Sequence, residues 1–139
     1  MGQYKKIMVS LIGDDSEQPV VDQAYHLANE LGARLTAIHV NDLHAGEMSM
    51  MMDSPKKVTD EMIRGQIKDY GYESILGELE IIITENESVS KAIEQHCKDF
   101  DLLIVGHRKM SEFKSRFMDS IDEGIANLVP CPVLVVLKD

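Results

Sequence analysis

Five short, mostly apolar runs alternate along the chain with segments whose apolar residues recur at helical spacing. The runs are Ile7–Ile12, Leu35–Val40, Leu79–Thr84, Leu102–Val105 and Val133–Leu137. Such runs are typical of strands in a parallel sheet that helices cover on both faces. The alternation therefore predicts one α/β domain over residues 1–139, with a five-stranded parallel sheet in a doubly wound fold.

Start and stop signals place about four helices between these runs. The first helix begins after Ser16, carries Pro19 in its first turn and ends before Gly32. The others are expected over Val58–Tyr70, around Val89, Ala92, Ile93 and His96, and around Phe117, Ile121, Ile125 and Leu128 before Pro130. The stretch Asn41–Pro55 has no helical period, which predicts a long surface loop.

We expect the strand order 3-2-1-4-5. In a doubly wound sheet a ligand binds beyond the carboxyl ends of the strands, where the strand order reverses. Here that point lies between the end of the first strand, at Ile12–Asp14, and the end of the fourth, at Gly106. Candidate binding residues are therefore expected in these two loops.

Composition restricts the classes of function. The chain has 44% hydrophobic and 27% charged residues, and no apolar run is long enough to span a bilayer. Its first residues lack the apolar segment of a signal peptide, which predicts a cytoplasmic protein. A net charge of −10 disfavours binding to nucleic acid or to an anionic membrane. Cys97 and Cys131 have neither metal-ligand nor redox spacing, so we expect reduced structural thiols.

The sequence contains no pattern typical of a catalytic or metal site. Neither a Ser-His-Asp set, nor paired carboxylates, nor metal-ligand spacing stands out. His44 and the methionines of Met48–Met52 offer soft ligands that suit Cu(I), but flexible thioethers more often pack against an adaptable surface. We therefore expect neither enzyme activity nor a bound metal.

Four segments, in this order and at this spacing, carry a resemblance that covers essentially the whole chain. They are Lys6–Val9, Ile38–Val40, Asp101–Gly106 and Pro132–Val136. Together they resemble the universal stress protein family. Its nucleotide-binding members carry G-x2-G-x9-G-[S/T] after the fourth strand. The four positions of that motif are Gly106, Lys109, Asp119 and Ser120 here.

Two glycines of the phosphate-binding motif are thus replaced. Glycine lets backbone N–H groups approach a phosphate closely, because it has no Cβ. Lys109 has a long side chain, but with Arg108 it still offers donors to an anion. Asp119 is the stronger obstacle, since a carboxylate about 4 Å from a phosphate charge is opposed by roughly 4 kcal/mol. Ser120 matches the motif, although it also suits a helix cap.

The resemblance implies further nucleotide contacts. Family members that bind nucleotide usually close the first strand with an aspartate, but Ile12 falls in that register. Asp14 or Asp15 could replace that aspartate only if the loop carries an insertion. Backbone groups that contact adenine correspond to Val40 and Asn41. The pattern of matches and departures resembles the A-type branch of the family, whose members form dimers and do not bind ATP.

We therefore expect a cytoplasmic homodimeric stress-response or regulatory protein without efficient ATP binding and without a cofactor. The last strand, Val133–Leu137, would be an exposed apolar sheet edge in a monomer, so we expect two copies to pair there. An unknown protein client is a further possible partner. The alternative is a nucleotide-responsive switch that binds ATP or AMP, with Mg²⁺ in the case of ATP.

Overall fold

The computed structural model describes residues 4–13, 16–41, 57–108, 125 and 128–138. The helices and strands follow one another as β1 (Lys6–Ser10), α1 (Gln18–Leu31), β2 (Arg34–Asn41), α2 (Asp60–Asp69), the 3₁₀ turn η1 (Glu73–Ile75), β3 (Glu80–Glu85), α3 (Val89–His96), β4 (Leu102–Arg108) and β5 (Val133–Lys138).

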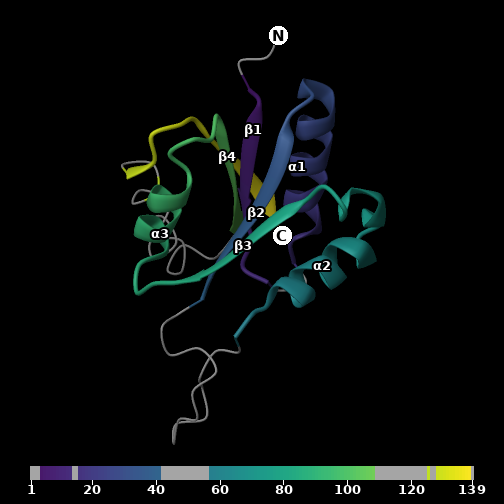
Figure 1. Cartoon of the computed structure of the whole chain (residues 1–139), viewed down its shortest axis with the longest axis horizontal. Coiled ribbons are helices and arrows are strands. Elements are labelled where there is room, and N and C mark those ends of the chain that lie inside the picture. Colours follow the sequence, from purple (N-terminus) through teal and green to yellow (C-terminus); the bar gives the residue numbers. More distant parts are fainter. Residues whose placement is uncertain (1–3, 14–15, 42–56, 109–124, 126–127, 139) are drawn as a thin grey trace, which may run out of the picture.

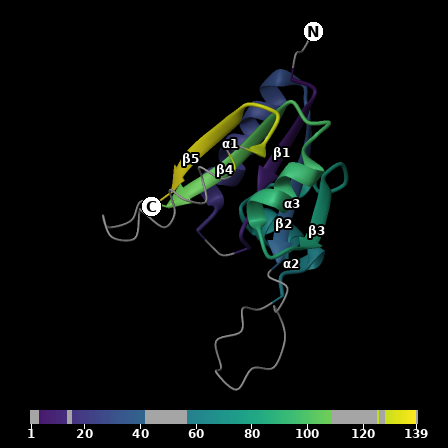
Figure 2. The same ribbon diagram turned by 90° about the vertical axis from the view of Figure 1, so that its left-hand side faces the viewer.

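The five strands form one parallel sheet in the order β3-β2-β1-β4-β5, which confirms the predicted order. β1 lies in the middle, where Val9 is level with Ala37 of β2 and Ile104 of β4. β3 and β5 lie at the two edges (Figure 2). Because β1 pairs with β2 on one side and β4 on the other, the strand order reverses at its carboxyl end.

Helices cover both faces of the sheet. Figure 1 shows α1 and α2 on one face and α3 on the other. Side chains alternate between these faces: Ile7 and Val9 enter the core beneath α1 and α2, whereas Met8 enters the core beneath α3. All three are essentially inaccessible to solvent. The two cores explain why β1 is apolar at consecutive positions.

The helix boundaries follow the signals in the sequence. Pro19 lies in the first turn of α1, and Gly32 ends this helix with the left-handed backbone angles φ 64° and ψ 31°. Thr59 begins α2 by accepting a hydrogen bond from the backbone of Met62 at 3.3 Å. Within the described residues no helix is both long and apolar enough to cross a membrane.

Most strand boundaries differ slightly from the prediction, and the differences at the carboxyl ends of β1, β2 and β4 bear on the candidate site. β1 ends at Ser10 and not at Ile12, because the chain turns at Gly13, whose φ is +86°. β2 includes Asn41, which was expected to begin a loop. β4 continues past Gly106 to Arg108 and stays paired with β5.

The fourth predicted helix is described only at its end. Ile125 and Leu128 are helical, and the backbone N–H of Val129 donates to the carbonyl of Ile125 at 3.0 Å. Phe117, Ile121 and most of the predicted loop before Pro55 lie outside the described residues.

Candidate functional site

The carboxyl ends of β1 and β4 meet at the middle of the sheet. Ser10 at the end of β1 is level with Val105, and Gly106 follows directly. The turn Leu11–Gly13 leads from this point into the segment before α1. The predicted binding loops therefore start side by side at the reversal of strand order.

Glu17, directly before α1, holds the turn after β1. Its carboxylate accepts hydrogen bonds from the backbone N–H of Ile12, at 2.9 Å from each oxygen, and from that of Gly13 at 2.8 Å. The side chain is only 2% exposed. Successive backbone N–H groups that converge on one point form an anion-binding nest. In this protein a carboxylate of the chain itself occupies the nest.

Lys138, the last residue of β5, lies against the same carboxylate. Its Nζ is 3.9 Å from Glu17 Oε2 and donates to Ser16 Oγ at 3.3 Å. The Lys138 side chain is 4% exposed. A buried charge is tolerated when an opposite charge and hydrogen bonds compensate for lost water. The pair thus joins the start of α1 to the end of the edge strand.

Gly106 is enclosed by the chain's own side chains. A Cβ at this position would come within 2.7 Å of Val20 Cγ2 and within 3.3 Å of the Lys138 methylenes Cδ and Cε. Contacts below 3.0 Å force neighbouring atoms to move. The packing of α1 and β5 over β4 is therefore sufficient reason for a glycine here.

His39 and Gln66 hold the carbonyl groups of the same turn. His39 Nδ1 lies 2.7 Å from the Leu11 carbonyl oxygen, and Gln66 Nε2 donates to the Gly13 carbonyl at 2.7 Å. The Gly13 Cα faces Val58, because a Cβ there would lie 2.8 Å from Val58 Cγ2. Side chains from β2 and α2 thus fix the turn from its other side.

The side chain of Asn41, at the end of β2, also forms its hydrogen bonds within the protein. Its side-chain oxygen accepts from the backbone N–H of Val58 at 3.0 Å, and its Nδ2 donates to the Val58 carbonyl at 2.9 Å. His39 Nε2 lies 3.1 Å from the same side-chain oxygen. The backbone carbonyl of Asn41 accepts from Asn86 at 3.1 Å. With 2% exposure, Asn41 connects three segments of the protein.

The structure brings part of the predicted site together. Ile12, Val40, Asn41 and Gly106 lie at neighbouring carboxyl ends, and Arg108 is the last residue of β4. The remaining predicted residues, Asp14, Lys109, Asp119 and Ser120, lie outside the described residues.

Glu17 and Lys138 were not among the predicted site residues. In the sequence, Glu17 resembles an ordinary acidic residue near the start of a helix, and Lys138 resembles an ordinary solvated lysine after an apolar run. One signal was present: continued alternation along β5 places position 138 on the same face as Leu134 and Val136, which pack against the core.

The described residues contain no group of three His, Cys, Asp or Glu side chains that could hold a metal ion. Both Cys97 and Cys131 are free thiols. Burial raises the pKa of the Cys97 thiol to about 11. The pKa of Cys131 is also raised, chiefly by burial.

Comparison with known proteins places this geometry in a family. A family model described as the universal stress protein family matches residues 3–136. "Universal stress protein YxiE" of Bacillus subtilis is 27% identical, with 96% of this chain and 99% of the relative covered. "Universal stress protein A homolog" of Pasteurella multocida is 26% identical over 98% of this chain and 99% of the relative.

The fold is also that of solved structures. A crystal structure of a universal stress protein in complex with cAMP superimposes with a TM-score of 0.71, at 19% identity, over 99% of this chain and 100% of the other. The match of the family model over almost the whole sequence decides the assignment, and the chain belongs to the universal stress protein family.

Proposed function

We propose that this protein is a cytoplasmic stress-response or regulatory homodimer that does not bind ATP efficiently and catalyses no reaction. The observation that carries the proposal is the occupied anion-binding nest in the turn after β1, which we call the filled site. There Glu17 occupies the backbone N–H groups of Ile12 and Gly13, and Lys138 lies beside Glu17. Within the described residues, the backbone N–H groups of this turn that could bind an anion are therefore already engaged.

Electrostatics supports the same conclusion. A phosphate that used the Ile12 and Gly13 amides would have to displace Glu17 or lie close to it. At about 4 Å, the repulsion between two unit negative charges is roughly 4 kcal/mol at an effective dielectric constant near 20. That energy corresponds to about three decades of affinity. The net charge of −10 adds to this repulsion.

Titration calorimetry with ATP, AMP and cAMP tests the proposal. We expect dissociation constants weaker than roughly 10 μM, the affinity that corresponds to about −7 kcal/mol. Glu17→Gln removes the buried negative charge, so it should bind ATP more tightly than the natural chain. Glu61→Gln changes the net charge equally on the exposed start of α2 and should change nothing. Binding of ATP by the natural chain below 10 μM would overturn the proposal.

A nucleotide-responsive switch is the second candidate, favoured by the similar structure that is described in complex with cAMP. In this alternative Arg108 and Lys109 replace contacts of the missing glycines, with AMP or ATP as ligand and Mg²⁺ neutralising Asp119 in the case of ATP. The ultraviolet absorbance spectrum of the purified protein distinguishes the two candidates. It has no tryptophan and four tyrosines, so bound adenine would dominate its ultraviolet absorbance.

The homodimer proposal rests on β5. This strand lies at the edge of the sheet, and its side chains Val135 and Leu137 are 46% and 63% exposed. An apolar edge strand favours pairing with another chain, because its outer N–H and C=O groups need partners. A second copy related by a two-fold axis would offer the same strand.

Light scattering after size exclusion tests the dimer. We expect twice the chain mass of 15.6 kDa at micromolar concentration. Val135→Lys should give monomers, because a lysine on an edge strand opposes pairing. Met62→Lys alters a similarly exposed apolar residue on α2 (42% exposed) and should leave the dimer intact. A monomeric natural chain would contradict the proposal.

A further inference from the structure

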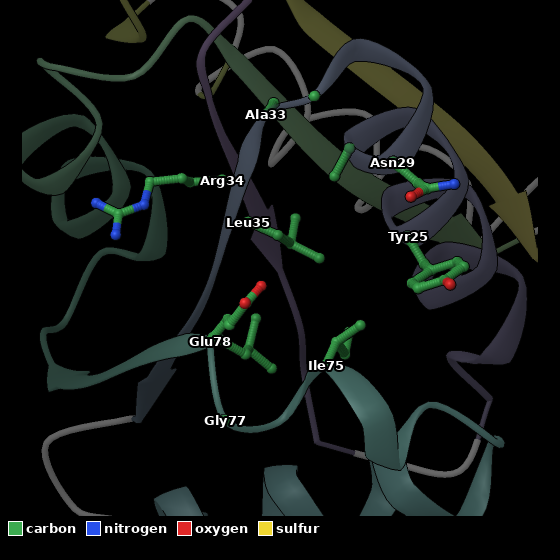
Figure 3. A pocket seen from close by; sticks show the side chains of 11 residues that line it. Tyr25, Asn29, Ala33, Arg34, Leu35, Ile75, Gly77 and Glu78 are labelled. Carbon is green, nitrogen blue, oxygen red and sulfur yellow. The ribbon is translucent and has the colours of Figure 1, made fainter.

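A cavity lies at the opposite end of the sheet from the filled site. Its volume is about 640 Å³, within the range of small-molecule pockets. It is lined by the last turns of α1, by the start of β2 and by the segment that leads from η1 into β3 (Figure 3). The filled site belongs to the carboxyl ends of the strands, whereas this cavity lies where β2 and β3 begin.

Apolar side chains and an aromatic ring form part of the cavity wall. Ala28, Leu35 and Leu79 contribute the apolar part, and Figure 3 shows the ring of Tyr25 across from Ile75. These surfaces can accept a flat apolar body, since an aromatic ring stacks or packs edge-on against another ring.

The ring of Tyr25 is held in place from behind. It packs on Tyr72, with ring centroids 4.6 Å apart and planes inclined by 31°. The Tyr72 hydroxyl donates to Asp22 Oδ1 at 2.5 Å, and this hydrogen bond is the main reason that the pKa of Tyr72 is raised to about 12. A wall fixed before a ligand arrives lowers the entropy lost on binding.

The polar groups of the cavity favour a positive charge. The carboxylate of Glu78 lies among the lining side chains, near Leu35, and the amide of Asn29 is close to Tyr25 (Figure 3). Helix α1 also ends at this cavity, and a helix carries a partial negative charge at its carboxyl end. The last turn of α1 contains no basic residue that would offset this charge.

Arg34 borders the cavity because it is next to Leu35 in β2, and its guanidinium group does not point into the space. Leu35 packs with the core beneath α1 and α2, and neighbouring residues of a strand point to opposite faces. Figure 3 shows the guanidinium of Arg34 directed away from Tyr25 and Leu35. The carboxylate of Glu78 is therefore the charged side-chain group that faces the space.

We propose that this cavity is a binding site for a small organic cation that carries an alkylammonium group on a planar aromatic ring, an arylalkylamine. The ring lies between Tyr25 and the apolar wall, and the ammonium group is near the carboxylate of Glu78. The proposal is independent of the state of the filled site at the other end of the sheet.

Tryptamine is a suitable probe, because the protein has no tryptophan and the indole fluorescence then comes from the probe alone. We expect saturable binding with a dissociation constant of roughly 1 mM, as is usual for a ligand of this size. Indole-3-propionate has the same ring with a negative charge, and it should bind at least about fivefold more weakly because of Glu78.

Two pairs of variants locate the site. Glu78→Gln should weaken tryptamine binding about threefold, as expected for an exposed charge pair, whereas Glu87→Gln, just beyond the carboxyl end of β3, should not. Gly77 borders the cavity, lacks a positive φ and has no atom within 4 Å of an added Cβ, so Gly77→Phe can fill the space without strain. Gly65 in α2 is equally open, and Gly65→Phe is the matched control.

The outcomes separate the cavity from general attraction to an acidic protein. Loss of tryptamine binding of about tenfold in Gly77→Phe, with Gly65→Phe unchanged, supports the proposal. Three results would overturn it: no saturable binding of tryptamine, equal binding of indole-3-propionate, or full binding by Gly77→Phe.

Discussion

Lys138 and Glu17 lie far apart in the sequence, yet Nζ of the first is 3.9 Å from Oε2 of the second and both side chains are almost fully buried. Glu17 in turn holds the amides of Ile12 and Gly13. One buried ion pair therefore connects the turn after the central strand with the edge strand β5. This connection links the candidate ligand site to the proposed dimer surface.

We predict that Lys138→Met lowers the free energy of unfolding by about 3 kcal/mol, because it leaves the Glu17 carboxylate buried without its cation. The double variant Lys138→Met, Glu17→Gln should recover at least half of that loss. Urea denaturation of the three proteins measures both values. The exposed pair Lys57–Glu85 is the control, and Lys57→Met should cost less than about 1 kcal/mol. Equal losses of unfolding free energy in Lys138→Met and Lys57→Met would contradict the stabilising role of the buried pair.

The second prediction concerns Gly106, a residue that both the family motif and the packing could require. An added Cβ would come within 2.7 Å of Val20 Cγ2, so Gly106→Ala should destabilise the protein by about 1–2 kcal/mol. Combining it with Val20→Ala should cost less than the sum of the single variants, because the smaller residue makes room for the methyl group. The test is the free energy of unfolding, measured without nucleotide. If Gly106→Ala leaves this free energy unchanged, packing does not require the glycine.

The elements of the fold could be predicted because each has a local cause. Consecutive apolar residues mark β1, whose Val9 is buried on one face and Met8 on the other. Gly32 marks the end of α1, since the left-handed angles there favour glycine. Local signals of this kind do not depend on the rest of the chain, so the sequence pattern is sufficient to read them.

The candidate site was only partly predictable, because its main contacts join distant segments. Ile12 was expected to close the first strand but lies in the turn after β1, and nothing next to it in the sequence indicates that its amide binds Glu17. Lys138 follows an apolar run and looks solvated, although the α1 face of the sheet buries it. Such a role follows from tertiary packing, which overrides the local preference of a charged residue for water.

A third prediction concerns Asp101, whose carboxylate ties the N-terminal segment to β4. Oδ2 accepts hydrogen bonds from the backbone N–H of Lys5 at 2.8 Å and of Lys6 at 2.9 Å. These bonds lower the pKa of Asp101 below its ordinary value of 3.8. The unfolded chain therefore takes up this proton first, so the stabilising contribution is complete above pH 3.8 and is lost as the pH falls towards the lowered pKa.

Asp101→Asn should accordingly flatten the fall of the unfolding free energy at acid pH. The measurement is urea denaturation at a series of pH values from neutral to below the ordinary aspartate pKa. Asp99→Asn removes the same charge from an exposed residue nearby and serves as the control. A pH profile of Asp101→Asn identical to that of the natural chain would contradict the role of these two hydrogen bonds.

The last prediction is the order in which the thiols react. Burial raises the pKa of Cys97 to about 11, so at pH 8 this group is a protonated thiol without access to solvent. Cys131 is partly exposed and should react first with iodoacetamide, even though its pKa is also raised. Mass spectrometry of the native protein should show one alkylated site at Cys131, and a second at Cys97 only in denaturant. Cys131→Ser leaves Cys97 as the remaining thiol, and rapid alkylation of that native variant would show that the core beneath α3 opens readily.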